Sequence, residues 1–425
     1  MTHKFENNLA FAKGMDEKDS LRSFRDQFHF PEKSPGEPYL YFCGNSLGLQ
    51  PKSVKTMINE ELDDWSKFGV EGHFEAKRPW VAYHEYLTEK MAGVVGAKPE
   101  EVVCMNSLTV NLHLMMVSFY RPEGSRNKIL IEGGAFPSDQ YAVASQARFH
   151  GLEAKDTVLE LTPRNGESIL RTEDILEYID EHGDSIALVM LGGVNYLTGQ
   201  AYDMEAITKK GHEKGCLVGF DLAHGAGNLA LELHQWDVDF AVWCSYKYLN
   251  SGPGGIAGAF VHERHLGTDL PRFEGWWGHS KDKRFKMEST FEAIPTVEAW
   301  QMSNPPIFQL ASLLASLELF EKAGMKALRA KSEVLTSYLE FLVEETFGSR
   351  ELVITPRNPA DRGAQLSFKV PKGGKDVLHA LRKKGAICDF REPNIIRAAP
   401  APLYNSFEDV FNFVSVLKDC VDEIS

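Results

Sequence analysis

Short apolar segments alternate with helical patterns through the middle of this 425-residue chain, and this alternation limits the possible folds more than any other feature. Helical patterns at 172–182 and 203–214 are each followed by a glycine. Strands that are apolar throughout are typical of a parallel sheet that helices cover on both faces. The sequence therefore predicts an α/β fold with a large, mainly parallel sheet. Its expected strands are residues 128–132, 186–191, 217–221, 239–243 and 256–261.

The two ends of the chain differ from this middle part. Residues 1–50 are rich in proline, glycine and charge, which predicts an irregular segment with short helices. We expect this segment to contribute to a small domain and to the substrate site. A large domain is expected over 51–320 and a small α+β domain over 321–425. The expected order in the small domain is helix 332–346, strands 352–355 and 365–370, helix 375–384, strands 386–390 and 395–398, and helix 406–424.

Two successive strands of this pattern end near side chains of opposite charge. The run 217–221 ends at Asp221, and the run 239–243 leads into Tyr246, Lys247 and a glycine-rich loop. Ligands of open α/β sheets bind at the carboxyl ends of the strands. Pyridoxal 5′-phosphate (PLP) requires this pair, because a lysine forms the Schiff base and an anion keeps the pyridine nitrogen protonated. The sequence therefore predicts a PLP site, whereas a lone lysine at a strand end would fit an ordinary surface position.

Charge and composition restrict the partners of the chain. The 46 Lys and Arg residues against 60 Asp and Glu give a formal net charge of −14, which argues against nucleic acid and anionic membranes as partners. We find no signal segment at the start, and no stretch approaches the ~18 apolar residues of a membrane helix. The six cysteines lie far apart without a Cys-x-x-Cys pair. We therefore expect reduced thiols, no metal, and a cytoplasmic enzyme that acts on a small molecule.

Several sequence blocks extend the pattern over most of the chain. Together, and in this order, they resemble the kynureninase family, whose members have the aspartate-aminotransferase fold of PLP-dependent enzymes. Many families share the acid and lysine pair alone, so the additional blocks make the resemblance specific. They are NSLTVNLH at 106–113, AFPSD at 135–139, DLAHGAGN at 221–228, WCSYKYLN at 243–250, GWWGH at 275–279, RFKM at 284–287, SNPP at 303–306 and IRAAPAPLYN at 396–405.

The resemblance implies a set of residues around the cofactor. Thr109 at a helix start would offer its hydroxyl and free N–H groups to the phosphate, although a plain N-cap is the ordinary alternative. Phe136 would stack on the ring, unless it is an ordinary core residue. His224 would be a cofactor neighbour, with a structural histidine as the alternative. The implied cofactor residues are Leu108, Thr109, Phe136, Pro137, Ser138, Asp139, Asp221, His224, Tyr246, Lys247, Trp276 and Asn304.

The resemblance also implies a substrate site that two subunits share. In the family, the residues that match Trp276 and Asn304 reach the phosphate of the other subunit, so we expect a homodimer with shared active sites. Arg397 would bind the carboxylate of an amino-acid substrate, with Asn45 as its helper. His73, Ser303 and Asn304 match the members that prefer a 3-hydroxylated ring. Gly192 departs from the pattern, since some members carry a serine there.

The implied activity is kynureninase: hydrolysis of L-kynurenine or 3-hydroxy-L-kynurenine to anthranilate or 3-hydroxyanthranilate plus L-alanine. The 3-hydroxylated substrate is expected to be preferred, and Lys247, Tyr246 and Asp221 are expected to be catalytic. Such an enzyme serves tryptophan breakdown or NAD synthesis. The alternatives are a cysteine desulfurase, a class V aminotransferase or a non-catalytic PLP-binding protein. A desulfurase needs a mobile thiolate, and Cys388 and Cys420 fall in an expected strand and helix.

Overall fold

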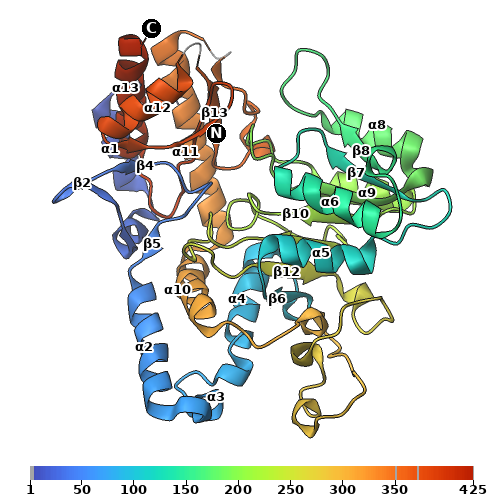
Figure 1. The fold of residues 1–425 in the computed structure, drawn as a ribbon. Coiled ribbons are helices and arrows are strands. Elements are labelled where there is room, and N and C mark those ends of the chain that lie inside the picture. The colour runs from blue at the N-terminus through green and yellow to red at the C-terminus, as the bar shows by residue number, and fades with distance from the viewer. Residues whose placement is uncertain (1–3, 350–351, 371–372, 425) are drawn as a thin grey trace.

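The computed structural model describes residues 4–349, 352–370 and 373–424. Its largest sheet has seven strands in the order β6-β12-β11-β10-β9-β7-β8 (Figure 1). The strands from β11 to β8 in this order are parallel, whereas β12 is antiparallel to both β11 and β6. The predicted mainly parallel sheet is therefore confirmed. The strands are β6 (Val102–Cys104), β7 (Lys128–Glu132), β8 (Val158–Leu161), β9 (Ile186–Gly192), β10 (Leu217–Asp221), β11 (Phe240–Trp243) and β12 (Gly258–Val261).

Helices cover both faces of this sheet, as its continuous apolar strands require. In β7, alternate residues join different hydrophobic clusters: Ile129 and Ile131 belong to the cluster with residues of α5 and α6, whereas Leu130 belongs to the cluster with residues of α4, α8, α9 and α10. We call these two clusters together the large core. The helices are α4 (Glu85–Val95), α5 (Leu108–Phe119), α6 (Pro137–Phe149), α7 (Ala154–Thr157), α8 (Thr172–His182), α9 (Met204–Glu213) and α10 (Ile307–Ala323).

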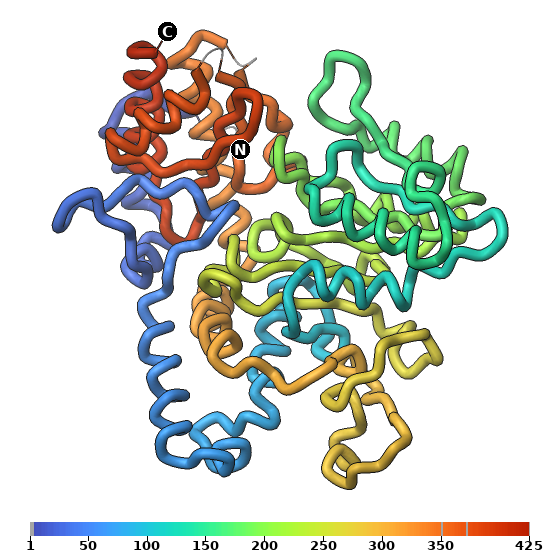
Figure 2. The backbone as a smooth tube through the Cα atoms, viewed as in Figure 1, coloured from blue at the N-terminus to red at the C-terminus, as the bar shows by residue number. Residues whose placement is uncertain are grey.

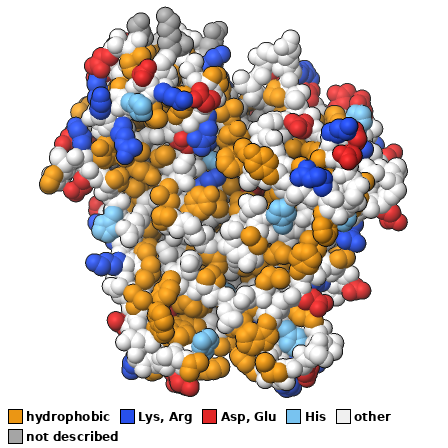
Figure 3. All heavy atoms as spheres, viewed as in Figure 1, with side chains coloured by type: hydrophobic (Ala, Val, Ile, Leu, Met, Phe, Trp, Pro, Cys, Tyr) orange, Lys and Arg blue, Asp and Glu red, His pale blue; other side chains and the backbone are white. Residues whose placement is uncertain are grey.

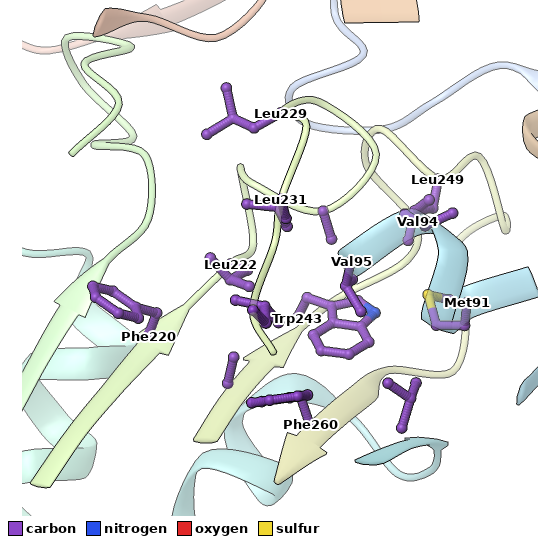
Figure 4. Close-up of a cluster of buried hydrophobic side chains, with 14 of the residues drawn as sticks. Met91, Val94, Val95, Phe220, Leu222, Leu229, Leu231, Trp243, Leu249 and Phe260 are labelled. Atoms are coloured by element: carbon purple, nitrogen blue, oxygen red, sulfur yellow. The ribbon is translucent and has the colours of Figure 1, made fainter. Parts of the chain in front are cut away.

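One part of the large core lies where β11 and β12 meet α4 (Figure 4). Trp243 and Phe260 project from the two strands toward Met91 and Val95 of the helix. Each of these four side chains is fully buried. Burying a large apolar side chain contributes about 1.5–3 kcal/mol. This packing therefore supports the end of β11, directly before the segment that carries the lysine.

The second packing unit combines the end of the chain with its beginning. We call its cluster the small core; it contains Ala12 and Phe42 as well as residues from Leu335 to Cys420. α1 (Leu9–Lys18) packs on α13, and β4 (Leu40–Tyr41) pairs in parallel with β14, so the two ends of the chain lie side by side (Figure 2). The other elements are α11 (Met325–Phe347), β13 (Leu366–Lys369), α12 (Gly374–Lys383), β14 (Ala386–Ile387), β15 (Asp389–Arg391), β16 (Ile395–Ala398) and α13 (Phe407–Ile424).

Two expectations for this unit are wrong. The expected strand 386–390 is divided, because β14 pairs with β4 while β15 joins the antiparallel sheet β13-β16-β15. The expected strand 352–355 is reduced to an isolated bridge between Val353 and Phe368. There the side-chain oxygen of Thr355 accepts a hydrogen bond from the backbone N–H of Ser367, in the place of a backbone partner.

An arm formed by α2 (Ser53–Phe68) and α3 (Gly72–Glu75) runs along the lower left of the molecule (Figure 1). α2 packs on α10. Four short strands precede the arm: β1 (Phe28–His29), β2 (Glu32–Ser34), β3 (Glu37–Pro38) and β5 (Gln50–Pro51). Among the described residues, no helix has the length and apolar character needed to cross a membrane.

The large core predicts a strong effect of one truncation. Replacing Phe260 with alanine should lower the free energy of unfolding by about 3–5 kcal/mol, because the site is fully buried. The matched control is Tyr141→Ala, since Tyr141 is 71% exposed and should change the value by less than about 0.5 kcal/mol. Urea unfolding followed by circular dichroism measures both. Equal effects of the two changes would contradict this account of the core.

Candidate active site

The predicted acid and lysine lie next to each other at the carboxyl edge of the sheet. Asp221 ends β10, and Lys247 follows β11, the neighbouring parallel strand. They border a cavity of ≈ 190 Å³. Nine of the predicted cofactor residues line it: Leu108, Thr109, Phe136, Ser138, Asp139, Asp221, His224, Tyr246 and Lys247. Glu132, Gly192, Val194, Tyr196 and Ala223 complete the wall. Pro137, the tenth, lies between two of them as the first residue of α6.

The start of α5 can bind an anion. Leu108 and Thr109 form its first turn, where backbone N–H groups have no partner inside the helix. The N-cap residue, Ser107, makes no side-chain hydrogen bond to these groups. The preceding Asn106 has a φ of 52°, a left-handed conformation that asparagine tolerates, and its amide donates to Asn111. This turn therefore presents uncapped N–H groups to the cavity, as a phosphate requires.

Three buried carboxyl groups gather at the opposite side of the cavity. Asp221, Asp139 and Glu132 are each at most 9% exposed. Burial raises the pKa of Asp139 well above its ordinary value, and the charge of Asp221 raises it further. Burial also raises the pKa of Glu132, to about 7. Burial raises the pKa of Asp221 as well, but hydrogen bonds from the backbone N–H of Ala223 and from Asp139, and the charge of Lys247, oppose this rise, so Asp221 is the one of the three favoured as an anion.

His224 is a buried neighbour of the lysine. Its Nε2 lies 3.1 Å from the Nζ atom of Lys247, and its Nδ1 has no hydrogen-bond partner in the described part of the chain. Burial, and then the charge of Lys247, lower the pKa of His224 well below its ordinary value, so the ring is neutral. A buried ring nitrogen without a partner fits a residue that faces a ligand better than it fits a structural histidine.

Phe136 and Tyr246 complete the surroundings of the lysine. Phe136 is 44% exposed, so it is not a core residue, and its ring centroid lies 5.9 Å from the Nζ atom of Lys247. Burial raises the pKa of Tyr246, which therefore keeps its phenolic proton. The cavity offers an anion site, an acid for a ring nitrogen, an amine and an aromatic face. These are the groups that PLP requires, so the residues present fit this cofactor.

Arg397 lies beside this cavity. It is 1% exposed on β16, and its Nη1 donates to the backbone oxygen of Tyr196, a residue of the cavity wall. Its Nη2 pairs with Asp389 and donates to the Ser46 hydroxyl at 3.3 Å. Arg391 binds the same Asp389 carboxylate at 2.8 Å, so two arginines share one acid and the group has a net positive charge that suits an anionic ligand.

The predicted helper of Arg397 is fully buried in the neighbouring loop. Asn45 donates to the side chain of Gln365 at 2.8 Å, and its own Oδ1 has no partner in the described part of the chain. Sequence reasoning missed Asp389, because it placed residues 386–390 in a single strand. Antiparallel pairing of Asp389 with Arg397 was therefore not visible.

Besides Pro137, Asn45 and Arg397, four more predicted residues do not line the cavity of their own chain. His73 on α3, Trp276 in the short turn η7 (Trp276–Gly278), Ser303 and Asn304 all lie outside it. They are found near an exposed apolar surface on the arm and the adjoining loops. We call it the arm surface; it contains Trp65, Val70, Phe74, Trp276, Phe285, Met287 and Phe308, each at least 36% exposed. Hydrophobic side chains are also prominent at the lower end of the molecule in Figure 3.

The thiols do not support a sulfur-transfer site. Burial raises the pKa of all six cysteines, to about 11 for Cys43 and about 12 for Cys104. The charge of Asp389 also raises the pKa of Cys43, while the charge of Arg397 lowers it. A desulfurase would need one of these groups as a thiolate.

Solved structures with the same fold are PLP-type enzymes. The cysteine desulfurase of Thermococcus onnurineus NA1 superposes with a TM-score of 0.74 at 21% identity, over 91% of this chain and 95% of its own. A C-DES variant that carries glycine linked covalently to its PLP cofactor superposes with a TM-score of 0.77 at 19% identity, over 93% and 99%. These likenesses establish the fold, the predicted aspartate-aminotransferase type.

Fold and site together define a PLP-dependent enzyme of this type. The kynureninase of Myxococcus xanthus is 63% identical over 97% of both chains, and that of Homo sapiens is 49% identical over 96% of this chain and 92% of its own. Residues 328–417 also match the family described as the kynureninase C-terminal domain. The chain belongs to the kynureninase family of PLP-dependent hydrolases.

The carboxyl cluster predicts a dependence of stability on pH. The pKa of Asp139 is raised in the folded protein. Its contribution to the free energy of unfolding is therefore complete below its ordinary pKa of 3.8 and is lost as pH rises. Asp139→Asn removes this loss, so the cofactor-free variant should lose less stability than the parent between about pH 5 and about pH 8. Urea unfolding at both pH values measures it. Asp156→Asn, at an exposed position, is the control, and identical behaviour of all three proteins would contradict the assignment.

Proposed function

We propose that the chain catalyses the kynureninase reaction, the hydrolysis of L-kynurenine or 3-hydroxy-L-kynurenine to anthranilate or 3-hydroxyanthranilate plus L-alanine. One observation carries this proposal: Lys247, the buried Asp221 and the start of α5 enclose one cavity, and Arg397 joins its wall through Tyr196. Relatives named kynureninase that match nearly the whole chain support the same activity. The raised thiol pKa values argue against a desulfurase, and the intact lysine and arginine argue against a non-catalytic protein.

The residues have distinct roles in this proposal. Bound PLP supplies an electron sink for the substrate carbons. Asp221 keeps the ring nitrogen protonated, with Asp139 as its hydrogen-bonding partner. Arg397 holds the substrate carboxylate, with Asn45 nearby. The amine of Lys247 removes the proton from the substrate α-carbon, and the neutral His224 at 3.1 Å adds no competing charge.

Tyr246 is the proposed proton donor. Its phenol lines the same cavity as Lys247 and keeps its proton because burial raises its pKa. Leu108, Thr109, Phe136, Pro137 and Ser138 are the proposed contacts of the phosphate and the ring. A proton that Tyr246 delivers beside the pyridine ring prepares the substrate for cleavage. The bond between its β- and γ-carbons then breaks after water adds to the γ-carbonyl. The products are then the aromatic acid and alanine.

The Lys247 role has a direct test. The parent protein should gain the mass of the cofactor after borohydride reduction, and Lys247→Ala should lose both this adduct and measurable release of alanine. The lysine is the covalent attachment point and the base, so both losses share one cause. Lys155→Ala, at an exposed position, is the control. Retained turnover in Lys247→Ala would overturn the proposed function.

We also propose a homodimer in which each active site uses both subunits. His73, Trp276, Ser303 and Asn304 lie outside the cavity of their own chain and near the arm surface. Ring contacts connect part of this surface, because the ring centroid of Phe285 lies 6.4 Å from that of Phe74 and 5.7 Å from that of Trp276. Large exposed apolar patches mark interaction sites, and a second copy would bring these residues to the partner's cofactor.

Mixed dimers test the shared site. Lys247→Ala and Trp276→Ala chains should each have little activity alone. After mixing, one site of each hybrid dimer contains both native residues, so part of the activity should return. The measurement is anthranilate fluorescence, with hybrid formation checked by native mass spectrometry. Hybrids that form without any activity would place both residues in the site of one subunit.

The 3-hydroxylated substrate is the proposed preference. His73 and Asn304 carry polar groups that can hydrogen-bond a ring hydroxyl. A site built for a hydroxyl discriminates against a substrate that lacks it, because its own polar groups remain unpaired. Both residues belong to the group that we propose serves the partner's site.

Substitution of these two residues tests the preference. The parent should favour 3-hydroxykynurenine by about tenfold or more in kcat/KM, since one unpaired hydrogen bond costs about 1–3 kcal/mol. The double change His73→Trp with Asn304→Thr should shift the ratio toward kynurenine. Both ratios are measured with purified substrates. A parent that favours kynurenine would disprove this reading of the pocket.

The proposed setting is the cytoplasm, with a role in tryptophan breakdown or in NAD synthesis. All six cysteines are free thiols in the structure, which supports a reducing compartment. The negative net charge supports a small-molecule substrate rather than nucleic acid or membrane lipid as the partner.

A further inference from the structure

Glu132 occupies a position in the cavity that the family pattern does not predict. It ends β7, while Gly192 ends β9 and Asp221 ends β10. β9 lies between the other two strands, and Gly192 stands directly opposite Asp221 in the ladder. The Glu132 side chain reaches across to β9, where its Oε2 accepts the backbone N–H of Gly192 at 2.9 Å.

The absence of a side chain at position 192 makes room for this carboxyl group. A Cβ atom added to Gly192 would lie 2.9 Å from Oε1 of Glu132, closer than real contacts allow. Glu132 therefore fills the space into which a larger residue at 192 would project. Both residues line the cavity that contains Lys247 and Asp221. At this position the chain combines a glycine on one strand with a carboxyl group from the next.

A purely structural role explains this group poorly. Glu132 is 4% exposed, and no lysine or arginine forms an ion pair with it in the described part of the chain. Burying a carboxyl group without a cation is unfavourable, and here burial raises its pKa to about 7. Accepting one backbone N–H needs only a neutral oxygen. A carboxyl group that retains its proton near neutral pH can donate a hydrogen bond into the cavity.

The substituents of the pyridine ring identify the atom that Glu132 meets. The ring nitrogen is assigned to Asp221, the carbon that bears the aldehyde to Lys247, and the phosphate to the start of α5. The remaining polar substituent is the phenolic oxygen. The wall residues that remain for it are Gly192, Val194, Tyr196, Ala223 and Glu132, and among these five Glu132 has the only buried polar side chain.

We propose that Glu132 is a further cofactor-binding residue, whose carboxyl group donates a hydrogen bond to the phenolic oxygen of PLP in place of a side chain at position 192. The inference rests on the proposed PLP-dependent function. It assigns a third acid to the site with a task separate from that of Asp221 and Asp139. The three carboxyl groups therefore serve two different atoms of one cofactor, the ring nitrogen and the phenolic oxygen.

A double comparison of protein and cofactor tests this assignment. Parent, Glu132→Leu and Glu132→Gln proteins are freed of cofactor and titrated with PLP and with 3-deoxypyridoxal 5′-phosphate, which lacks the phenolic oxygen. Glu132→Leu should bind PLP about tenfold more weakly, because one hydrogen bond to a polar oxygen is lost. The same change should alter binding of the deoxy analogue by less than about twofold. Glu132→Gln keeps a donor and should recover most of the PLP affinity.

Controls separate the possible failures. Glu160→Leu removes an exposed carboxylate from β8 beside β7 and should leave both affinities unchanged. Gly192→Ser should weaken PLP binding in the parent, where it meets Glu132, and restore it in the Glu132→Leu background.

Equal losses for PLP and the analogue would overturn the contact with the phenolic oxygen, and no loss for either would reduce Glu132 to a structural role. If Glu132→Leu fails to fold, the PLP affinities of the other two variants decide. Near-parent affinity of Glu132→Gln with weaker binding by Gly192→Ser supports the contact, and the reverse result overturns it. A parent protein that binds no PLP would instead overturn the proposed function.

Discussion

The carboxyl ends of parallel strands meet at one edge of the sheet, and the active site depends on this constraint. β7, β9, β10 and β11 lie side by side and point the same way, so Glu132, Gly192, Asp221 and the segment with Lys247 reach the same cavity from distant parts of the sequence. The two hydrophobic layers keep these strands in place. The sheet can therefore keep three carboxyl groups away from water, because their burial is enforced by packing that is independent of the acids.

Much of this arrangement follows from the sequence. The runs at 128–132 and 217–221 became β7 and β10 with unchanged bounds, since continuous apolar strands admit few alternatives. Nine cofactor residues converged because each follows a strand or begins a helix at the same edge. β6 and β8 were not predicted: β6 has three residues, and the charged Glu160 interrupts the apolar run of β8. α2 was missed as well, although its 16 residues form one of the longer helices.

Contacts between distant side chains explain what the sequence did not predict. The Asp389–Arg397 pair depends on the register of β15 against β16, which a strand prediction does not specify. The proposed role of Glu132 could be inferred only once the close approach of its carboxyl group to Gly192 was known. The separation of His73 from the cavity of its own chain also needed coordinates, because the resemblance assigned only Trp276 and Asn304 to the other subunit.

The chain passes from the small core to the large core in the two segments that contain Asn45 and Arg397, the residues proposed to bind the substrate. Phe42 belongs to the small core and Leu49 to the large core, so the loop with Asn45 and Ser46 spans the boundary between them. Directly after Arg397 the chain crosses again, from Ala398 in the small core to Ala401 in the large core. A substrate carboxylate bound by these residues, as proposed, would therefore connect the two packing units. Substrate affinity should consequently depend on how the two cores are oriented relative to each other.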